Sequence, residues 1–514
     1  MTQGATQHSS SSTGSWVLAA TILGSSMVFI DGSVVNVALP AIQSAFSASV
    51  SGVQWLVNAY MLVLGALILI GGSAGDRFGR RRVFVIGTLI FAAASVVCGI
   101  AQTLPVLIAA RAAQGFGGAL LTPGSLAIIN DVFDSGERGR AIGTWASFSA
   151  LSAAVGPAIG GALVDTVSWR AIFFINIPLA AVTLAITMRH VPESRNEQSA
   201  GIDWFGGLLA VAGLGAITYG LTAAVERHWS DPIVLGATLG GMVIMGVFVL
   251  LERRSASPMV PLTLFRSRAF SVTNGMTVLL YAALSGAFFF LPFSLIQLHG
   301  YSALETGAAL LPSTLLMGGL SRWSGGLADR YGARRPLVVG PVIAGAGFAL
   351  LALPGTGGSY WLTFFPALMV LGLGLAVSVA PLTTTVMGAV ARRYSGTASG
   401  INNAAARVAG LLAVAMLGSV AVGVFGAAVE TRIATADVPA NIRHSIEAEI
   451  PRLAAAQVPS EVTGNMRQEL ERILNESFLR SFRTVMLISA GLALASGLCA
   501  GVMLKDDGRE REDV

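Results

Sequence analysis

Fourteen long apolar segments constrain this chain more than any other feature of its sequence. A helix rises about 1.5 Å per residue, so roughly 20 apolar residues cross the 30 Å hydrocarbon core of a bilayer. Because 54% of the residues are hydrophobic and only 11% are charged, a soluble core could not bury this apolar surface. We therefore predict an all-α integral membrane protein. The expected spans are residues 16–39, 53–73, 83–102, 105–129, 141–164, 171–188, 204–224, 232–251, 271–297, 306–327, 337–354, 360–386, 398–425 and 482–504.

The distribution of arginine predicts how these spans are oriented. The short loops on one face carry only Arg170 and Arg227, whereas the alternate loops are rich in arginine. By the positive-inside rule, we expect the arginine-rich loops and both termini to be cytoplasmic. The residues in those loops and in the C-terminal tail are Arg77, Arg80, Arg81, Arg82, Arg138, Arg140, Arg189, Arg195, Arg253, Arg254, Arg266, Arg268, Arg330, Arg334, Arg335, Arg392, Arg393, Lys505, Arg509 and Arg511.

Three segments lie outside the predicted spans, and the sequence predicts where each of them is located. Residues 1–15 are rich in Ser, Thr and Gln and are expected to form a disordered cytoplasmic tail. Residues 505–514 are expected to form a second cytoplasmic tail. Segment 426–480 carries both arginines and acids, and the parity of the spans places it outside. We interpret it as an external, partly helical cap; the alternative is that one nearby span is miscounted.

An internal repeat predicts the architecture. The octapeptide Gly75-Asp76-Arg77-Phe78-Gly79-Arg80-Arg81-Arg82 is similar to Ala328-Asp329-Arg330-Tyr331-Gly332-Ala333-Arg334-Arg335. Eight predicted spans separate the two copies, and an even number places both on the same face, as a parallel repeat requires. We expect a six-helix bundle over 16–190, two inserted helices over 204–251 and a second six-helix bundle over 268–504 that includes 426–480.

The repeated D-R-x-G-x-R-R loop resembles the hallmark of the major facilitator superfamily. The span count is similar to its fourteen-span drug:proton antiporter branch, the EmrB/QacA type. Further resemblances lie in span 1 (Phe29 to Pro40) and at the entry to span 6 (Trp169-Arg170 and Asn176-Ile177-Pro178). Span 4 shows the family pattern at Leu107, Arg111, Gln114, Gly115, Gly117 and Gly118, and in span 5 Ser152 replaces a glycine of the family pattern. The span-5 motif is Gly156-Pro157-Ala158-Ile159-Gly160-Gly161. The resemblance implies the major facilitator fold, and this span-5 signature marks exporters; the alternative is that its small residues only permit close helix packing.

Asp31 is the only acid well inside a predicted span. An ionised carboxylate in the middle of a bilayer is costly and normally marks a transport pathway. Asp31 lies about 12 Å and Arg111 about 9 Å from the outer ends of their helices, so the two can pair. We predict that they couple transport to protons; the alternative is a permanent structural ion pair.

The repeated loops are candidates for a cytoplasmic gate, because a carboxylate between arginine-bearing helix ends can make and break charge-assisted hydrogen bonds. The alternative is that the arginines only hold the loops inside. The candidate gate residues are Gly75, Asp76, Arg77, Gly79, Arg80, Arg81, Asp329, Arg330, Gly332 and Arg334.

Polar and aromatic residues within the spans are candidates for a substrate cavity. The alternatives are that the polar groups join helices and that the aromatic rings face lipid or the core. The second half contains no embedded acid in our reading, which argues against polycationic cargo. The candidates are Asn36, Gln114, Trp145, Tyr281, Phe289, Asn402, Asn403 and Arg407.

The function indicated is proton-coupled efflux of drugs or small lipophilic metabolites across a bacterial plasma membrane. Lys505 is the only lysine, which excludes a Walker phosphate loop and ATP-driven transport by this chain. An uptake symporter, a lipid flippase and a membrane sensor are the alternatives; no enzyme, cofactor or metal spacing stands out.

The expected partners are a small lipophilic substrate, protons and membrane lipid, with no nucleic acid. If the host is Gram-negative, a periplasmic adaptor and an outer-membrane channel are further candidates. We expect a monomer to be functional.

Overall fold

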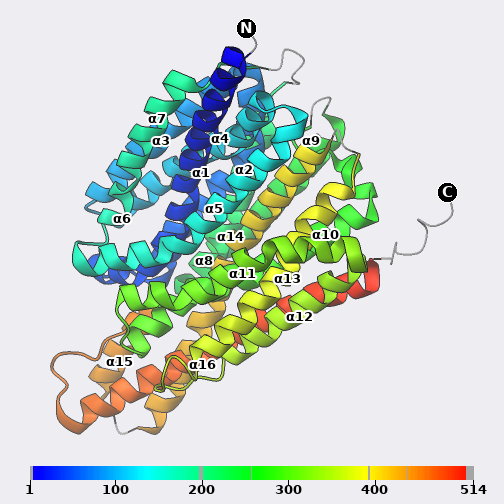
Figure 1. The fold of residues 1–514 in the computed structure, drawn as a ribbon. Helices are drawn as coiled ribbons and strands as arrows, with labels where there is room; N and C mark the ends of the chain where they lie inside the picture. The colour runs from blue at the N-terminus through cyan, green and yellow to red at the C-terminus, as the bar shows by residue number, and fades with distance from the viewer. Residues whose placement is uncertain (1–3, 196–200, 256–257, 392–393, 437, 505–514) are drawn as a thin grey trace.

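The computed structural model describes residues 4–195, 201–255, 258–391, 394–436 and 438–504, which form an almost entirely helical molecule (Figure 1). The helices of the first half are α1 (Gly4–Phe46), α2 (Val50–Phe78), α3 (Arg80–Ile100), α4 (Leu104–Val132), α5 (Ser135–Thr166), α6 (Ala171–Phe174), α7 (Asn176–His190), α8 (Trp204–Arg227) and α9 (Pro232–Arg254). Those of the second half are η1 (Leu262–Arg266), α10 (Arg268–Phe293), η2 (Ser294–Leu298), α11 (Ala303–Tyr331), α12 (Arg334–Leu351), α13 (Phe364–Gly388), α14 (Ser395–Thr435), α15 (Ala440–Glu449), η4 (Ile450–Ala455) and α16 (Gly464–Met503).

Within the described residues, fourteen helical segments are long and apolar enough to cross a membrane, which confirms the expected number of spans. They form two six-helix bundles and an inserted pair. The first bundle contains α1 to α7, with α6 and α7 making one span, and the second contains α10 to α14 and α16. Figure 1 shows the two bundles as separate groups of helices. Of the inserted pair α8 and α9, α8 packs on both α2 and α14 and so covers one junction between the bundles.

Glycines allow the helices of each bundle to approach closely, as is usual in membranes. A Cβ atom at Gly117 of α4 would lie 2.7 Å from the backbone nitrogen of Phe91 in α3. A Cβ atom at Gly347 of α12 would lie 2.6 Å from the Cα atom of Leu371 in α13. A larger residue at either position would therefore push the two helices of its pair apart.

The two ends of the molecule differ. We call the end that carries the loops around Gly79 and Gly332 the arginine-rich end, and the end that carries α15 and η4 the α15 end. Figure 1 shows α15 far from both chain termini. Helix α1 begins at Gly4, so the expectation of a disordered tail over 1–15 is wrong from residue 4 onward. The expected tail 505–514 lies outside the described residues.

Segment 426–480, which we expected to be a partly helical external cap, is helical over most of its described length. Helix α14 continues to Thr435 and α16 begins at Gly464, so both extend well beyond their apolar cores. Between them lie α15 and η4. Ion pairs stabilise the extended part, because Arg432 of α14 contacts Glu476 of α16 and Arg472 contacts both Glu469 and Glu476.

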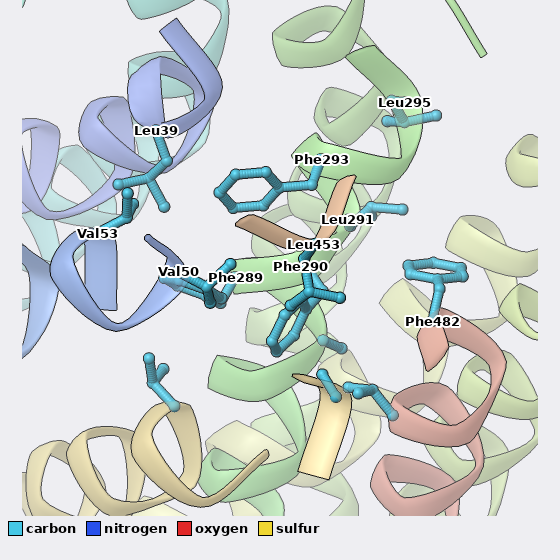
Figure 2. Close-up of a cluster of buried hydrophobic side chains, with 14 of the residues drawn as sticks. Leu39, Val50, Val53, Phe289, Phe290, Leu291, Phe293, Leu295, Leu453 and Phe482 are labelled. Atoms are coloured by element: carbon cyan, nitrogen blue, oxygen red, sulfur yellow. The ribbon is translucent and has the colours of Figure 1, made fainter. Parts of the chain in front are cut away.

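An apolar cluster closes the α15 end between the bundles. It contains Leu39 of α1, Val50 and Val53 of α2, residues 289–293 of α10 and Leu453 of η4, and all of its apolar side chains are buried. Figure 2 shows Leu39 and Val53 on one side facing the phenylalanines of α10. The rings of Phe289 and Phe290 meet edge to face with centroids 4.9 Å apart. We call this cluster the apolar plug.

Candidate functional site

A buried network of polar side chains surrounds Asp31 of α1. The carboxylate has no exposed surface and forms an ion pair with Arg111 of α4. It also accepts hydrogen bonds from Nε2 of Gln114 at 3.2 Å and from Nδ2 of Asn176 at 3.3 Å. The predicted pairing of Asp31 with Arg111 is therefore present, and three donors compensate the buried charge.

The charge of Arg111 is compensated as fully as that of Asp31. Its Nη1 donates to Oε1 of Gln114 at 2.7 Å, and its Nε donates to the carbonyl oxygen of Leu56 at 3.3 Å. The guanidinium carbon lies 4.2 Å from the centre of the Tyr60 ring, which is a cation–π contact. A buried charge costs several kcal/mol unless it is paired and hydrogen-bonded, and both conditions hold here.

Ser95 of α3 hydrogen-bonds to Gln114 and Asn176, the two amides that contact Asp31. Its Oγ accepts from Gln114 at 2.7 Å and from Asn176 at 3.3 Å, and it donates to the carbonyl oxygen of Phe91. Sequence reasoning missed Tyr60, Ser95 and Asn176 as members of this site. The available signal was that Ser95 and Asn176 are polar residues within or at the start of apolar spans, but which helices they face depends on the packing.

A central cavity of about 420 Å³ lies between the two bundles. A cavity of this size is typical for a drug-sized ligand. The first bundle lines it with Val28, Phe29, Gly32, Ser33, Val35, Asn36, Val57, Tyr60, Met61, Arg111 and Ala153. The second bundle lines it with Tyr281, Ser285, Thr383, Val386, Met387, Ser399, Asn402, Asn403, Ala406 and Arg407.

The cavity extends toward the arginine-rich end. Met387 lies in the last turn of α13 and Ser399 lies near the start of α14, so both are at the ends of these helices that face each other along the chain. Met387 is 40% exposed. Asp31 is absent from the lining, whereas its neighbours Arg111 and Tyr60 are part of it, so the carboxylate is adjacent to the cavity but separated from it.

Five of the eight predicted cavity residues line this cavity: Asn36, Tyr281, Asn402, Asn403 and Arg407. The other three do not. Gln114 belongs to the Asp31 network, and Nε1 of Trp145 donates to Oγ of Ser25, which joins α5 to α1. Phe289 belongs to the apolar plug, where it contacts other aromatic rings of its own helix (Figure 2).

Asn402 joins helices within the second bundle. Its Nδ2 donates to Oγ1 of Thr277 at 2.7 Å and to Oδ1 of Asn274 at 3.2 Å, both on α10. Nδ2 of Asn403 donates to the carbonyl oxygen of Ser399 one turn earlier. Both amides therefore have structural bonds as well as a position at the cavity wall.

At the arginine-rich end, the first copy of the repeated loop forms a charge cluster. Arg80 bridges Asp76, at 3.0 Å, and Asp131 at the end of α4, also at 3.0 Å. Arg77 is exposed, with its guanidinium 5.9 Å from the ring of Phe78, and Gly75 accepts the backbone N–H of Gly79 at 3.1 Å. All of these groups belong to the first bundle.

Glu193, which follows α7, contacts the start of α3 beside the same cluster. Its carboxylate accepts the backbone N–H groups of Arg81 and Arg82 at the start of α3, at 3.0 and 3.2 Å. An anion is favoured at a helix N-terminus. Gly79 has a φ of 108°, and a Cβ atom there would lie 2.7 Å from Oε1 of Glu193, so this turn requires glycine. Asp131 and Glu193 were not predicted, because both read as ordinary loop acids.

The second copy of the loop makes different contacts. Gly332 has a φ of 75°, and Arg334 donates to the carbonyl oxygen of Gly501 near the end of α16, with Nε at 3.1 Å. Arg330 is exposed, and the side chain of Asp329 lies outside the described residues. The two copies share a backbone turn but use their arginines on different partners.

At the α15 end, α5 locks onto α11 of the other bundle. Gly161 packs on the carbonyl group of Ala303, and Gly307 packs on that of Pro157. The carboxylate of Asp165 accepts the backbone N–H groups of Ala303 at 3.1 Å and Leu304 at 2.8 Å, and so caps the N-terminus of α11. Within its own bundle, α5 presents Gly156 to Ser33 and Gly160 to Val34 of α1. The span-5 motif thus packs against both bundles.

A cavity between two bundles, blocked at one end and reaching toward the other, defines a multi-pass membrane transporter. Residues 21–414 match the sequence profile of the Major Facilitator Superfamily. Together with the similarity to curated relatives described next, this match shows that the chain belongs to that superfamily.

Several curated relatives are similar over nearly the whole chain. The multidrug resistance protein Stp of Mycobacterium tuberculosis is 34% identical, over 92% of this chain and 88% of the relative. The tetracenomycin C resistance and export protein of Streptomyces glaucescens is 31% identical, over 96% and 92% of the two chains. The puromycin resistance protein of Streptomyces alboniger is 36% identical, over 79% and 82%.

Solved structures share the fold at lower identity. A bacterial homologue of the human lysosomal transporter Spinster, in an inward-facing and unoccupied conformation, matches with a TM-score of 0.68 and 17% identity, over 96% of this chain and 98% of that chain. A D-xylose–proton symporter matches with a TM-score of 0.60 and 13% identity, over 96% and 98%. These likenesses concern the fold alone.

Proposed function

We propose that this protein exports small lipophilic compounds from the bacterial cytoplasm in exchange for protons, by alternating access of one central cavity. The observation that carries the proposal is the buried Asp31–Arg111 pair directly behind the cavity wall. A fully buried, titratable carboxylate beside a cavity of drug size is suited to binding a proton and cargo in turn. The names of the relatives, which describe resistance and export, support the direction.

Protonation of Asp31 is the step that couples the two fluxes. A proton on the carboxylate removes the negative charge that holds Arg111, and Gln114 and Asn176 then lose part of their attraction to Asp31. Because Arg111 lines the cavity, its release changes the wall that cargo meets. A ligand or proton shifts a conformational equilibrium only through its different affinity for the two states, and this network supplies that difference.

The arginine-rich end is the cytoplasmic one in this proposal, by the positive-inside rule. The state described is then closed outside by the apolar plug and by the α5–α11 contact, with the cavity reaching toward the cytoplasm. The Asp76–Arg80–Asp131 cluster acts as part of the cytoplasmic gate when the bundles close there. The pathway lies within one chain, so a monomer suffices.

The test is susceptibility profiling of a bacterial host that lacks its own major pumps. Expression of the protein should lower the susceptibility to at least one lipophilic antibiotic, with puromycin as the first to try because a relative is named for it. A protonophore should abolish the protection. Protection that persists in the presence of the protonophore, or that is absent for every compound while the protein is in the membrane, would contradict the proposal.

A further inference from the structure

Arg407 of α14 is a cation at the cavity wall, and none of the described carboxylates pairs with it. In the described part of the chain, no acid lies within 4.0 Å of its guanidinium nitrogens. Its Nε is buried and has no hydrogen-bond partner there. A guanidinium to which the protein supplies no counter-ion can donate charge-assisted hydrogen bonds to an anionic group in the cavity.

Arg111 shows what a compensated guanidinium looks like in the same cavity. It has Asp31 as counter-ion and two oxygen acceptors in Gln114 and Leu56. Arg407 instead shares the cavity wall with the phenols of Tyr60 and Tyr281, which are neutral at physiological pH. The cavity therefore holds one cation whose counter-charge must come from elsewhere.

The packing fixes where Arg407 can reach. A Cβ atom added at Gly65 of α2 would lie 3.1 Å from the Cβ atom of Arg407, so the base of the side chain is held against the first bundle. Tyr281 lines the same cavity, and its hydroxyl has no hydrogen-bond partner among the described residues. Arg407 and Tyr281 together offer several donors to one oxygen-bearing group.

The rest of the wall combines small polar residues with apolar ones. The apolar part includes Val28, Phe29, Val57, Met61 and Val386. Such a cavity, with a few polar groups that fix orientation, suits a ligand with an apolar ring system and a single polar head.

We propose that the cavity binds amphiphilic weak acids, in which a carboxylate, enolate or phenolate oxygen pairs with Arg407 and an apolar ring system fills the remaining space. This rests on the proposed function, because it names the substrate class of the transport cavity. The assignment leaves Asp31 free to carry the proton, since the cargo does not need it as a counter-ion. A dication is excluded, because the cavity wall carries two arginines, and the carboxylate next to it, Asp31, is outside the lining and already paired with Arg111.

The test compares three probes that share one fluorophore: pyrenebutyrate, its primary amide and a pyrenebutyl trimethylammonium. Binding to purified protein in phosphatidylcholine nanodiscs at pH 7 is measured by energy transfer from tryptophan to pyrene. A charge-assisted hydrogen bond in a partly buried site is worth more than a neutral one, so the carboxylate should bind about tenfold more tightly than the amide. The ammonium should bind most weakly.

Variants assign this preference to one side chain. Arg407→Gln should remove the preference for pyrenebutyrate over the amide, and Arg407→Lys should keep part of it. Arg227→Gln is the matched control, because it removes an arginine that is 48% exposed and remote in sequence from the cavity lining, and the preference should persist. Equal binding of the three probes, or an unchanged preference in Arg407→Gln, overturns the proposal. Size-exclusion profiles and unfolding midpoints confirm that each variant is folded.

A further arm separates an acidic cargo from a lipid headgroup, which offers similar chemistry. In high salt, replacing part of the phosphatidylcholine with phosphatidylglycerol should leave the affinity for pyrenebutyrate unchanged. A selective loss of that affinity, with the amide unaffected, would show that lipid occupies the site and that the proposal is wrong. The binding measurement uses no proton gradient. If the protein prefers pyrenebutyrate but does not exchange protons for cargo, the proposed function is wrong while the proposed substrate class stands.

Discussion

We propose both a structural and a transport role for Asp31, and two variants can separate them. Asp31→Asn leaves Arg111 buried without its counter-ion, and breaking a buried pair in this way costs about 3–5 kcal/mol. We expect a lower unfolding midpoint in detergent for Asp31→Asn and substantial recovery in the double variant Asp31→Asn/Arg111→Gln. Neither should exchange protons for cargo.

The control for this pair is Asp31→Glu, which keeps a titratable carboxylate with a longer reach and should retain partial transport. If the double variant regains both stability and proton-driven transport, Asp31 is only a structural partner of Arg111. If Asp31→Asn is as stable as the wild type, the buried pair does not stabilise the fold as its geometry indicates.

The sequence predicted the centre of this site but not its periphery. The similar depth of Asp31 and Arg111 in their helices showed that the two could pair, because the rise per residue of a helix is fixed and the resemblance places both helices in one bundle. Asn176 and Ser95 could not be placed in the same way, because the faces that α7 and α3 turn toward α1 depend on helix rotation. Phe289 shows the same limit, since the sequence around an aromatic residue does not distinguish a cavity wall from the apolar plug.

At the scale of helices, the contact between α5 and α11 is the lock that closes the α15 end. Asp165 caps a helix of the opposite bundle, so these two hydrogen bonds must break when that end opens. Losing such a cap costs about 1 kcal/mol, or roughly a fivefold change in a population ratio. We therefore predict that Asp165→Ala increases the share of molecules open at the α15 end by about that factor.

The measurement is pulsed EPR between spin labels at Val167 and Leu362, which are 71% and 83% exposed. The chain contains only two cysteines, Cys98 and Cys499, so a cysteine-free background is accessible. Thr166→Ala is the control, because its hydroxyl bonds only within α5. An unchanged distance distribution in Asp165→Ala would show that the cap does not contribute to the lock.

The span-5 motif could be read from the sequence, but its neighbours could not. The glycines indicated close packing without saying which helix they meet. Gly156 and Gly160 meet α1, whereas Gly161 meets α11, and this division follows from the rotation of a single helix. Asp165 reads as a loop acid until α11 is placed beside it.

At the scale of the whole molecule, the orientation of the fourteen spans is a direct prediction of the arginine distribution. Single cysteines at Val167 and Leu362 should react with a membrane-impermeant maleimide in intact cells. Cysteines at Arg82 and Tyr331, which are also exposed, should react only after permeabilisation. Labelling of Arg82Cys or Tyr331Cys from outside would reverse the assignment of the two faces.

The number of spans and the repeat followed from the sequence, because hydrophobic length and the parity of the duplicated loop are one-dimensional properties. The position of the inserted pair did not follow, since contact of α8 with both α2 and α14 is a feature of the assembled bundles. The state of the transporter also required the structure, because the same sequence must adopt both closed and open arrangements.

The most direct test of proton-coupled export uses everted membrane vesicles that respiration acidifies, with acridine orange reporting the pH difference. Adding a compound to which the protein confers resistance should restore the quenched fluorescence in wild-type vesicles, because the cargo enters as protons leave. Vesicles with Asp31→Asn at matched expression should show no such recovery. An equal recovery in the two preparations, or none in the wild type, would contradict the account.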